Sequence, residues 1–493
     1  MTTETMPLLE ADCQHSHASD KWMVFAAIAA AAIVAWWHCR SITIWYDEAI
    51  TLLTTSGHAV PDWTLGMEEF RPTGNLLKIL LDLYNHDVHP PLYFWTLALW
   101  RVLFGGSLEI ARALSALFTL ATVGLLYRYA ALTKIRWAFV PAVLYALSAA
   151  GLRYAYNARP YAMATFLIVL TIYLSERKSQ WVGCCAAAAV ATHYFSVLCV
   201  GPIVTAACVL SWKTDRRWAV LTGVSFLLLS SPLSILVLHT GSTGAFPHFE
   251  QLGHELHALV KSSVAAAMPS ASEESLWQNW RHWNWVMYIV TAFAIMGTSL
   301  AIRRKQFLVP WTYAAFLGCF FAISIVTDKS IAKMPAEYYV GIATPFFVLL
   351  VAYGVNAIPT ASPILALCIA VGTVTSTKVP MWRTPDYRLM IKEIRSECSD
   401  CAIVVGTGWG RGVPGCVLYE AKANNVHPLR DDDDLRHIAA PNGLEHIVYF
   451  IPANEPRTAQ VEGHLLATFR HEEKRGYYKV EVSNYTSNRT PAP

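Results

Sequence analysis

Charged residues are scarce in this sequence. Only 15% of its 493 residues are charged, whereas 54% are hydrophobic, and the mean hydropathy is +0.35. Soluble domains carry about 25% charged residues, so this composition excludes a soluble globular protein and predicts a polytopic membrane protein. The formal net charge of +3 is too small to indicate a nucleic-acid partner, because the basic residues form short clusters between apolar runs.

Signals for processing and for a zinc finger are also missing. The polar residues 1–20 lack the basic region and small-residue cleavage site of a signal peptide, so we expect a cytoplasmic N-terminal tail followed by a retained anchor. Cys398 and Cys401 form a CxxC motif without a second pair at zinc-finger spacing. This pattern favours a structural disulfide or free thiols over a metal site.

Long apolar runs are abundant. A membrane-spanning helix needs about 20 apolar residues, because the hydrocarbon core is about 30 Å thick. The candidate spans are 21–38, 107–130, 136–152, 160–175, 180–195, 196–211, 218–238, 285–302, 307–326, 337–357 and 361–378. Basic clusters fall in alternate loops, which the positive-inside rule assigns to the cytoplasm. We therefore predict an α-helical transmembrane domain at residues 21–378 with about 11 transmembrane helices.

One more apolar stretch is HPPLYFWTLALWRVLF at 89–104. If it spanned the membrane, every later loop would lie on the opposite side of the membrane. It is short, begins with His-Pro-Pro, and contains Arg101 together with several Trp and Tyr residues. We therefore predict an interfacial helix on the outer surface. The loop 39–106 and the tail from residue 379 are then expected on the outer face.

The tail, residues 379–493, is polar and alternates short apolar stretches with helix-like segments. CAIVVG at 401–406 and HIVYFI at 446–451 are predicted strands, and residues 386–397 are a predicted helix. Such alternation indicates a small extracytoplasmic α/β domain.

A glycine-rich motif, GTGWGRGVPG at 406–415, lies inside this tail and contains a GxGxxG spacing. Pro414 interrupts the turn, and we expect the tail to lie outside the cell interior, where a dinucleotide site has no use. We predict a strand-to-helix turn.

An acid pair, Asp47 and Glu48, directly follows the first apolar run and lies beside Trp45 and Tyr46. Trp and Tyr are enriched at the membrane-water boundary. A carboxylate at that depth is partly desolvated and is suited to act as a general base. The alternative is that the pair only ends the helix and faces water.

A second polar cluster places His86, Asp87 and His89 on the segment NHDVHPPLYFW, whose two prolines hold the preceding residues extended. Imidazole and carboxylate at this spacing can ligate a metal, orient a base or bind a phosphate oxygen. The alternative is a polar turn that begins an interfacial helix. A divalent metal at these residues is therefore left open, and the sequence establishes no cofactor.

A third segment, LRYAYNARPYAM, has Arg153 and Arg159 flanking Tyr154, Tyr156 and Asn157. The positive-inside rule makes arginines on the outer face unexpected. A guanidinium can hold a phosphate through two parallel hydrogen bonds. The segment therefore predicts a phosphate site. Arginines that snorkel to the interface without a ligand are the alternative.

Two further ionisable residues lie at the outer ends of predicted spans. Arg112 lies near the start of one span, and an ionisable group at membrane depth is a functional candidate. His193, in the motif ATHYF, is a weaker candidate, because a lone His between spans is more often a packing residue.

The order of these motifs resembles a known family. The acid pair is followed by HPPLYFW, FGGSLEIARALSAL, YNARPYAM, THYF and EYYVGIATPFF. Over residues 20 to about 357 the chain resembles the GT-C membrane glycosyltransferases, in particular the branch of protein O-mannosyltransferases and lipid A aminoarabinose transferases. The order and spacing of these sequence motifs are the basis of the resemblance.

The resemblance implies inverting transfer of a sugar from a polyprenyl-phosphate donor to a protein, lipid or glycan on the outer or luminal side. It implies that Asp47 is either the base or the carboxylate that orients the acceptor. It also implies that Glu48 is the second acid of a mannosyltransferase-like pair. It places Arg112 and Arg159 where phosphate-contacting arginines are expected, and His89 in the segment that lines the same cavity.

The late segment departs from the family pattern, because relatives often have Arg-Tyr where this chain has Glu337, Tyr338 and Tyr339. Glu337 argues against a phosphate role at that position and leaves Lys329 and Lys333 as substitutes. The substrate-binding candidates are His89, Arg112, Arg153, Tyr156, Arg159, His193, Lys333 and Tyr338.

The predicted partners are the polyprenyl-phosphate sugar, the lipid bilayer and the extracytoplasmic acceptor, in a cell inner membrane or an endoplasmic reticulum membrane. A polytopic transporter is the main alternative. Transporters usually carry polar groups at the bilayer midplane and internal repeats, whereas the candidates here lie at the outer ends of spans. A catalytically degenerate protein of lipid-linked glycan assembly is the second alternative, which Glu337 keeps open.

Overall fold

The computed structural model describes most of the chain between residues 7 and 487. The described residues are 7–58, 66–87, 89–233, 259, 262–264, 266–267, 280–326, 339–358, 386–399, 401–406, 412–422, 426–429, 446–452, 458–467, 469–477 and 480–487. The chain forms two compact units. The helical unit comprises Met1–Cys39, Asp87–Tyr93 and Arg112–Trp382, and the mixed unit comprises Arg40–His86, Phe94–Ala111 and Arg383–Pro493.

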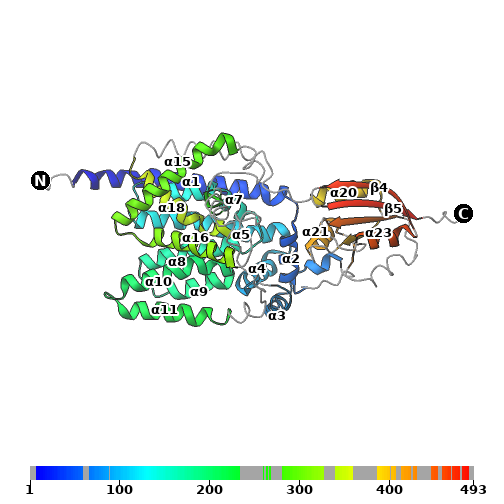
Figure 1. Ribbon diagram of the computed structural model, residues 1–493, viewed down its shortest axis with the longest axis horizontal. Coiled ribbons are helices and arrows are strands. Elements are labelled where there is room, and N and C mark those ends of the chain that lie inside the picture. The colour runs from blue at the N-terminus through cyan, green and yellow to red at the C-terminus, as the bar shows by residue number, and fades with distance from the viewer. Residues whose placement is uncertain are drawn as a thin grey trace. The chain divides into compact units, whose positions relative to one another are not determined.

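Apolar helices build the helical unit. They are α1 (Pro7–Ser41), α5 (Leu108–Leu132), α6 (Phe139–Leu147), α7 (Ala149–Ala155), α8 (Tyr161–Glu176), α9 (Val182–Thr192), η2 (Tyr194–Ser196), α10 (Val197–Ser211), α11 (Arg216–Ser230), α15 (Trp280–Arg303), α16 (Leu308–Val326), η4 (Gly341–Ala343) and α18 (Thr344–Val355). Helices α8, α9, α10 and α11 lie side by side in Figure 1. Gly297 of α15 and Gly354 of α18 let these two helices approach closely, because a Cβ at either position would collide with the facing backbone.

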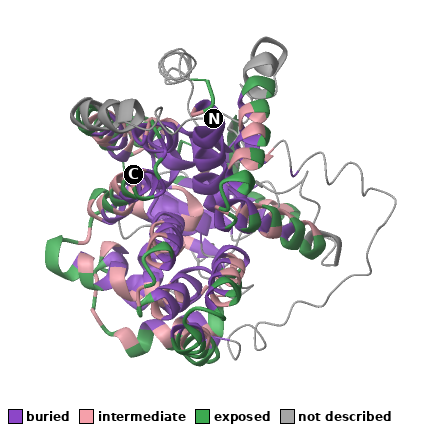
Figure 2. Ribbon diagram, turned by 90° about the vertical axis from the view of Figure 1, so that its left-hand side faces the viewer, coloured by how far each residue is buried: buried purple, intermediate pink, exposed green. Residues whose placement is uncertain are grey.

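Burial in the helical unit separates inner helices from outer ones. Every residue of α7 and α18 is buried, whereas α11 exposes Leu221, Leu227 and Leu228. Figure 2 shows the buried residues in the middle of the bundle and the exposed ones around it. Exposed leucines on a helix of a membrane protein are suited to contact lipid, since lipid tails are as apolar as leucine.

Three helices of the described residues are long and apolar enough to cross a membrane: Lys21–Ser41, Leu108–Leu132 and Tyr194–Ser211. The predicted spans overlap helices of the structure, apart from 361–378, which lies outside the described residues together with the predicted domain boundary at 379. The predicted interfacial segment 89–104 is also helical, as α4 (Pro91–Phe104). The number of spans and the position of α4 in the membrane stay predictions.

The mixed unit joins short helices of the loop after α1 with the C-terminal domain. Its loop elements are α2 (Tyr46–Ser56), η1 (Gly66–Phe70), α3 (Leu76–His86) and most of α4. Its C-terminal elements are α20 (Tyr387–Glu397), β1 (Ala402–Gly406), α21 (Gly412–Ala421), β2 (Val426–Leu429), β3 (His446–Pro452), α23 (Thr458–Leu466), β4 (Phe469–Tyr477) and β5 (Val480–Ser487). The α/β domain predicted for the tail is thereby confirmed.

The five strands form one sheet in the order β2-β1-β3-β5-β4 (Figure 1). Strand β1 pairs in parallel with β2 and β3, whereas β5 pairs antiparallel with β3 and β4. All five residues of β1 are buried, as expected of a central parallel strand covered on both faces. The predicted strands at 401–406 and 446–451 correspond to β1 and β3. The predicted strand-to-helix turn falls on residues 407–411, which lie outside the described residues.

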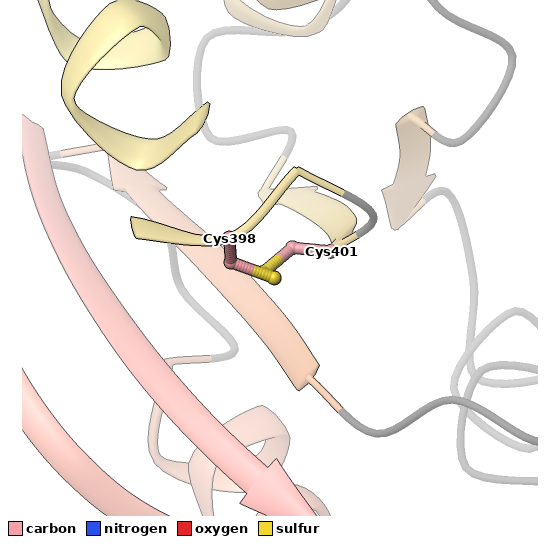
Figure 3. Close-up of a disulfide and its surroundings, with 2 residues drawn as sticks. All are labelled: Cys398 and Cys401. Carbon is pink, nitrogen blue, oxygen red and sulfur yellow. A yellow bond between two sulfur atoms is a disulfide. The ribbon is translucent and has the colours of Figure 1, made fainter. Parts of the chain in front are cut away.

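The CxxC motif forms a disulfide between Cys398, just after α20, and Cys401, just before β1 (Figure 3). The preference for a disulfide or free thiols over a metal site is therefore confirmed, and the disulfide is the form present. It joins the end of α20 to the start of the central strand.

Candidate active site

Arg159 and His89 meet in the helical unit, although 70 residues separate them in the sequence. Arg159 is buried in the turn between α7 and α8, directly before Pro160, whose fixed backbone precedes the first turn of α8. Its Nη2 lies 3.0 Å from Nε2 of His89. The other ring nitrogen of His89, Nδ1, lies 2.5 Å from Oδ1 of Asp87. The sequence predicted a role for each of these residues, and the structure brings all three together.

This geometry assigns the tautomer of His89. A guanidinium can only donate hydrogen bonds, so Nε2 of His89 must accept from Arg159 and carry no proton. The proton of the neutral ring is then on Nδ1, from which it is donated to the Asp87 carboxylate. Asp87 therefore orients His89, and His89 orients the guanidinium of Arg159.

His193 and a group of aromatic rings adjoin His89. The His193 ring centroid is 6.2 Å from that of His89 and 5.1 Å from that of Tyr161. Its Nδ1 accepts a hydrogen bond from the backbone N–H of Phe195, and His193 thereby caps the N-terminus of η2. Phe195 in turn lies 5.0 Å, between centroids, from Tyr339. His193 is thus buried between candidate residues of the site, and it also packs and caps a helix.

The two other candidate arginines of the helical unit, Arg153 and Arg112, are also buried. Arg153 lies in α7, within the same segment as Arg159. Arg112 on α5 donates from Nη1 to the backbone carbonyl of Cys39 at 3.0 Å, so it binds one of the last carbonyls of α1. The ring of Tyr156 lies beside that of His38, with centroids 5.1 Å apart and the ring planes tilted by 42°. Arg112 therefore has a structural contact in addition to the phosphate role that the sequence predicted.

The acid pair lies in the mixed unit, in the first turn of α2. Carboxylates are favourable there because the N-terminus of a helix carries partial positive charge. Glu48 is fully buried, at 0% exposure, whereas Asp47 is half-buried. The alternative in which both carboxylates face water is therefore wrong for Glu48. Of the two residues, Asp47 is the one that keeps solvent-accessible surface.

A cysteine of the C-terminal domain adjoins this pair. Cys416 on α21 is buried, and burial raises the pKa of its thiol well above the usual range. The negative charges of Glu48, Glu420 and Asp47 raise the pKa further. The thiol is therefore neutral and faces a region of negative charge.

Lys329, Lys333, Glu337 and Tyr338 lie outside the described residues. His86 is exposed at the end of α3. Among the residues that the structure describes, no three His, Cys, Asp or Glu side chains are arranged to hold a metal ion.

The sequence did not reveal the role of Arg101, which it placed on an interfacial helix. Arg101 is fully buried in the mixed unit and links three segments of the chain. Its Nη1 donates to the carbonyl of Leu52 at 2.9 Å and to the Thr55 hydroxyl at 2.5 Å. Its Nη2 donates to the carbonyls of Phe70 at 2.5 Å and Gly106 at 3.0 Å. The available signal was an arginine inside an apolar helix, which predicts a buried polar partner.

Comparison with solved structures identifies the fold. ArnT from Cupriavidus metallidurans bound to undecaprenyl phosphate aligns over 94% of this chain and 98% of its own, with a TM-score of 0.50 and 14% identity. The archaeal oligosaccharyltransferase AglB from Archaeoglobus fulgidus, in complex with an inhibitory peptide and a dolichol-phosphate, aligns over 96% of this chain and 75% of its own, with a TM-score of 0.45 and 11% identity. The chain has the GT-C fold that its motifs resemble, and it is an integral membrane protein.

Within that class the chain is similar to one family in particular. Residues 88–236 match the family model described as Dolichyl-phosphate-mannose-protein mannosyltransferase. The matched segment contains His89, Arg112, Arg153, Arg159 and His193, and it begins after the acid pair. No curated protein matches the chain.

Proposed function

We propose that this protein is an inverting glycosyltransferase that moves a sugar from a polyprenyl-phosphate donor to an extracytoplasmic acceptor. The observation that carries the proposal is the buried guanidinium of Arg159, held by neutral His89 inside the segment that matches the mannosyltransferase family. The GT-C relative bound to undecaprenyl phosphate supports the choice of a lipid-linked donor.

Arg159 is the proposed cation for the leaving phosphate. Breaking the bond between the anomeric carbon and the phosphate oxygen develops negative charge on that oxygen, and a preoriented guanidinium stabilises this charge. His89 accepts a hydrogen bond from one N–H of Arg159. This contact fixes the orientation of the guanidinium and therefore the direction in which its remaining N–H groups point. Arg153 is the proposed second cation of the segment.

Asp47 is the proposed base. An inverting displacement forms one bond from the acceptor oxygen to the anomeric carbon and breaks one bond to phosphate. The acceptor hydroxyl loses its proton to a carboxylate as it attacks. Asp47 fits this role because it is half-buried at the start of α2, whereas Glu48 is enclosed by the fold. We assign Glu48 to the orientation of the acceptor side of the site.

The test is release of polyprenyl phosphate by the purified protein from a panel of radiolabelled polyprenyl-phosphate sugars, in the presence of candidate acceptors. The proposal predicts release that depends on both the donor and an acceptor. Movement of an intact lipid-linked sugar or another anion across vesicles, without release of polyprenyl phosphate, would instead support the transporter and overturn the proposal.

A further inference from the structure

The glycine-rich motif of the C-terminal domain packs against the helix that carries the acid pair. A Cβ at Gly412 would lie 2.7 Å from Cβ of Tyr46, and a Cβ at Gly415 would lie 3.0 Å from Cβ of Ala49. Real Cβ atoms do not approach other atoms so closely without a shift of one element. Glycine at both positions therefore lets α21 approach α2 more closely than a larger residue would allow. The close approach of α21 to α2 accounts for two glycines of the motif, Gly412 and Gly415.

Glu420, on the last turn of the same helix, binds the chain just before the acid pair. Its Oε1 accepts a hydrogen bond from the Thr43 hydroxyl at 2.9 Å and one from the backbone N–H of Ile44 at 3.4 Å. Its side chain is only 7% exposed, so the carboxylate is shielded from competing water. These contacts link positions 377 and 376 residues apart in the sequence.

Arg388 completes this connection from a second helix of the C-terminal domain. Its Nε lies 3.3 Å from Oε2 of Glu420, and its Nη1 donates to the carbonyl of Arg40 at 3.1 Å. Glu420 and Arg388 together therefore hold both ends of the segment 40–44, which leads directly into α2. Asp47 follows that segment by three residues.

We infer that Glu420 is a positioning residue for the acid pair and that the C-terminal domain is part of the catalytic scaffold. The inference rests on the proposed function of Asp47. Glu420 fixes the backbone at Thr43 and Ile44, and α21 fixes the face of α2 through Gly412 and Gly415. The base is thus held by residues of α21, which follow it by more than 350 positions in the sequence. Neither Asp47 nor α21 lies in the segment that matches the mannosyltransferase family.

The kinetic test compares Glu420→Gln, Glu420→Ala and Thr43→Val with wild type. Glu420→Gln keeps an acceptor for Thr43 and loses the Arg388 ion pair, so we expect a fall in kcat of about threefold. Glu420→Ala removes every contact, and we expect kcat to fall by about 10- to 100-fold because small displacements of a base are costly. The donor KM should stay within about twofold, because the phosphate-binding residues are untouched. Glu462→Gln, at the exposed pair with Lys474, is the matched control and should behave as wild type.

A second measurement is independent of activity. Cys416 is buried between α21 and α2, so its thiol should resist alkylation by iodoacetamide in the wild type and react at least about tenfold faster in Glu420→Ala and Thr43→Val. The product is identified by mass spectrometry of the peptide that contains Cys416. If Glu420→Ala does not fold, Thr43→Val and Glu420→Gln provide the same comparison with smaller changes.

The outcomes separate the two proposals. A wild type that releases no polyprenyl phosphate removes the proposed function, whereas increased Cys416 alkylation in Thr43→Val would still support the contact. With an active wild type, unchanged kcat in Glu420→Ala and Thr43→Val overturns the positioning role. A rise in donor KM with unchanged kcat would also overturn it, since that result places Glu420 in donor binding.

Discussion

The guanidinium of Arg159 donates to Nε2 of His89 at 3.0 Å, while Nδ1 of the same ring lies 2.5 Å from the Asp87 carboxylate. One imidazole therefore couples a carboxylate to a cation that is proposed to bind phosphate. The arrangement requires neutral His89, because a protonated ring would have no lone pair for Arg159. Its effect is to fix the direction of the remaining guanidinium donors.

Arg159→Ala should weaken binding of the polyprenyl-phosphate donor by roughly 1.5 to 3 kcal/mol, the magnitude of a lost charge-assisted hydrogen bond. Donor affinity can be measured by isothermal titration in detergent. Arg177→Ala is the matched control, because Arg177 is exposed and its guanidinium binds the hydroxyl of Tyr173 and lies over the ring of that residue. Unchanged affinity in Arg159→Ala would remove Arg159 from the site.

His89→Ala should weaken donor binding less than Arg159→Ala does, because the cation remains but is free to rotate. The double variant should bind about as weakly as Arg159→Ala alone, since residues in one hydrogen-bond network are not additive. A double-mutant cycle on donor affinity measures this coupling. Additive losses would show that His89 acts separately from Arg159.

Arg101→Met should lower the free energy of unfolding by roughly 2 to 5 kcal/mol, because it leaves several buried carbonyl and hydroxyl groups without their donor. These acceptors include the carbonyls of Leu52, Phe70 and Gly106. Thermal unfolding in detergent, compared with Arg177→Met, tests the effect. A Tm equal to that of the control would contradict the structural role of Arg101.

The membrane orientation gives a further prediction. If residues 89–104 lie in the interface, the C-terminal domain is on the same side as the loop after α1, outside the cytoplasm. Single cysteines placed at the exposed positions Leu99, Val102 and Leu103 of α4 should react with an impermeant thiol reagent added outside. A reporter fused to the tail should report the outer side. A cytoplasmic tail would contradict the orientation derived from the basic loops.

Much of the fold could be predicted because single segments determine it. Uniformly apolar runs predicted the helices, and the alternation of CAIVVG with polar segments predicted the α/β domain, whose central strand β1 is buried throughout. The joining of segments distant in sequence could not be predicted. Nothing local in the neighbourhood of Glu420 indicates that its carboxylate binds Thr43, because this contact depends on the close approach of α21 to α2.

For the candidate site, too, the residue types could be predicted from the sequence but the contacts between them could not. His89 and Arg159 were candidates because of their residue types and positions, yet their direct hydrogen bond is a tertiary contact without a sequence signal. The adjacent residues Asp47 and Glu48 also differ in burial, because Glu48 is fully buried and Asp47 is half-buried. The helix that follows Trp45 turns adjacent side chains by about 100°, so one residue of the pair is fully buried and the other is half-buried.

The most direct measurement is transfer by Asp47→Asn with a donor that the wild type uses. The substitution keeps size and hydrogen-bonding capacity but removes the basic carboxylate, so the rate should fall by at least about 10² while donor binding is retained. Glu48→Gln should cost less, because one base suffices for an inverting displacement. Glu68→Gln, which alters an exposed acid paired with Arg71, should keep the wild-type rate. Near-normal transfer by Asp47→Asn with the natural acceptor would contradict the assignment of Asp47 as the base.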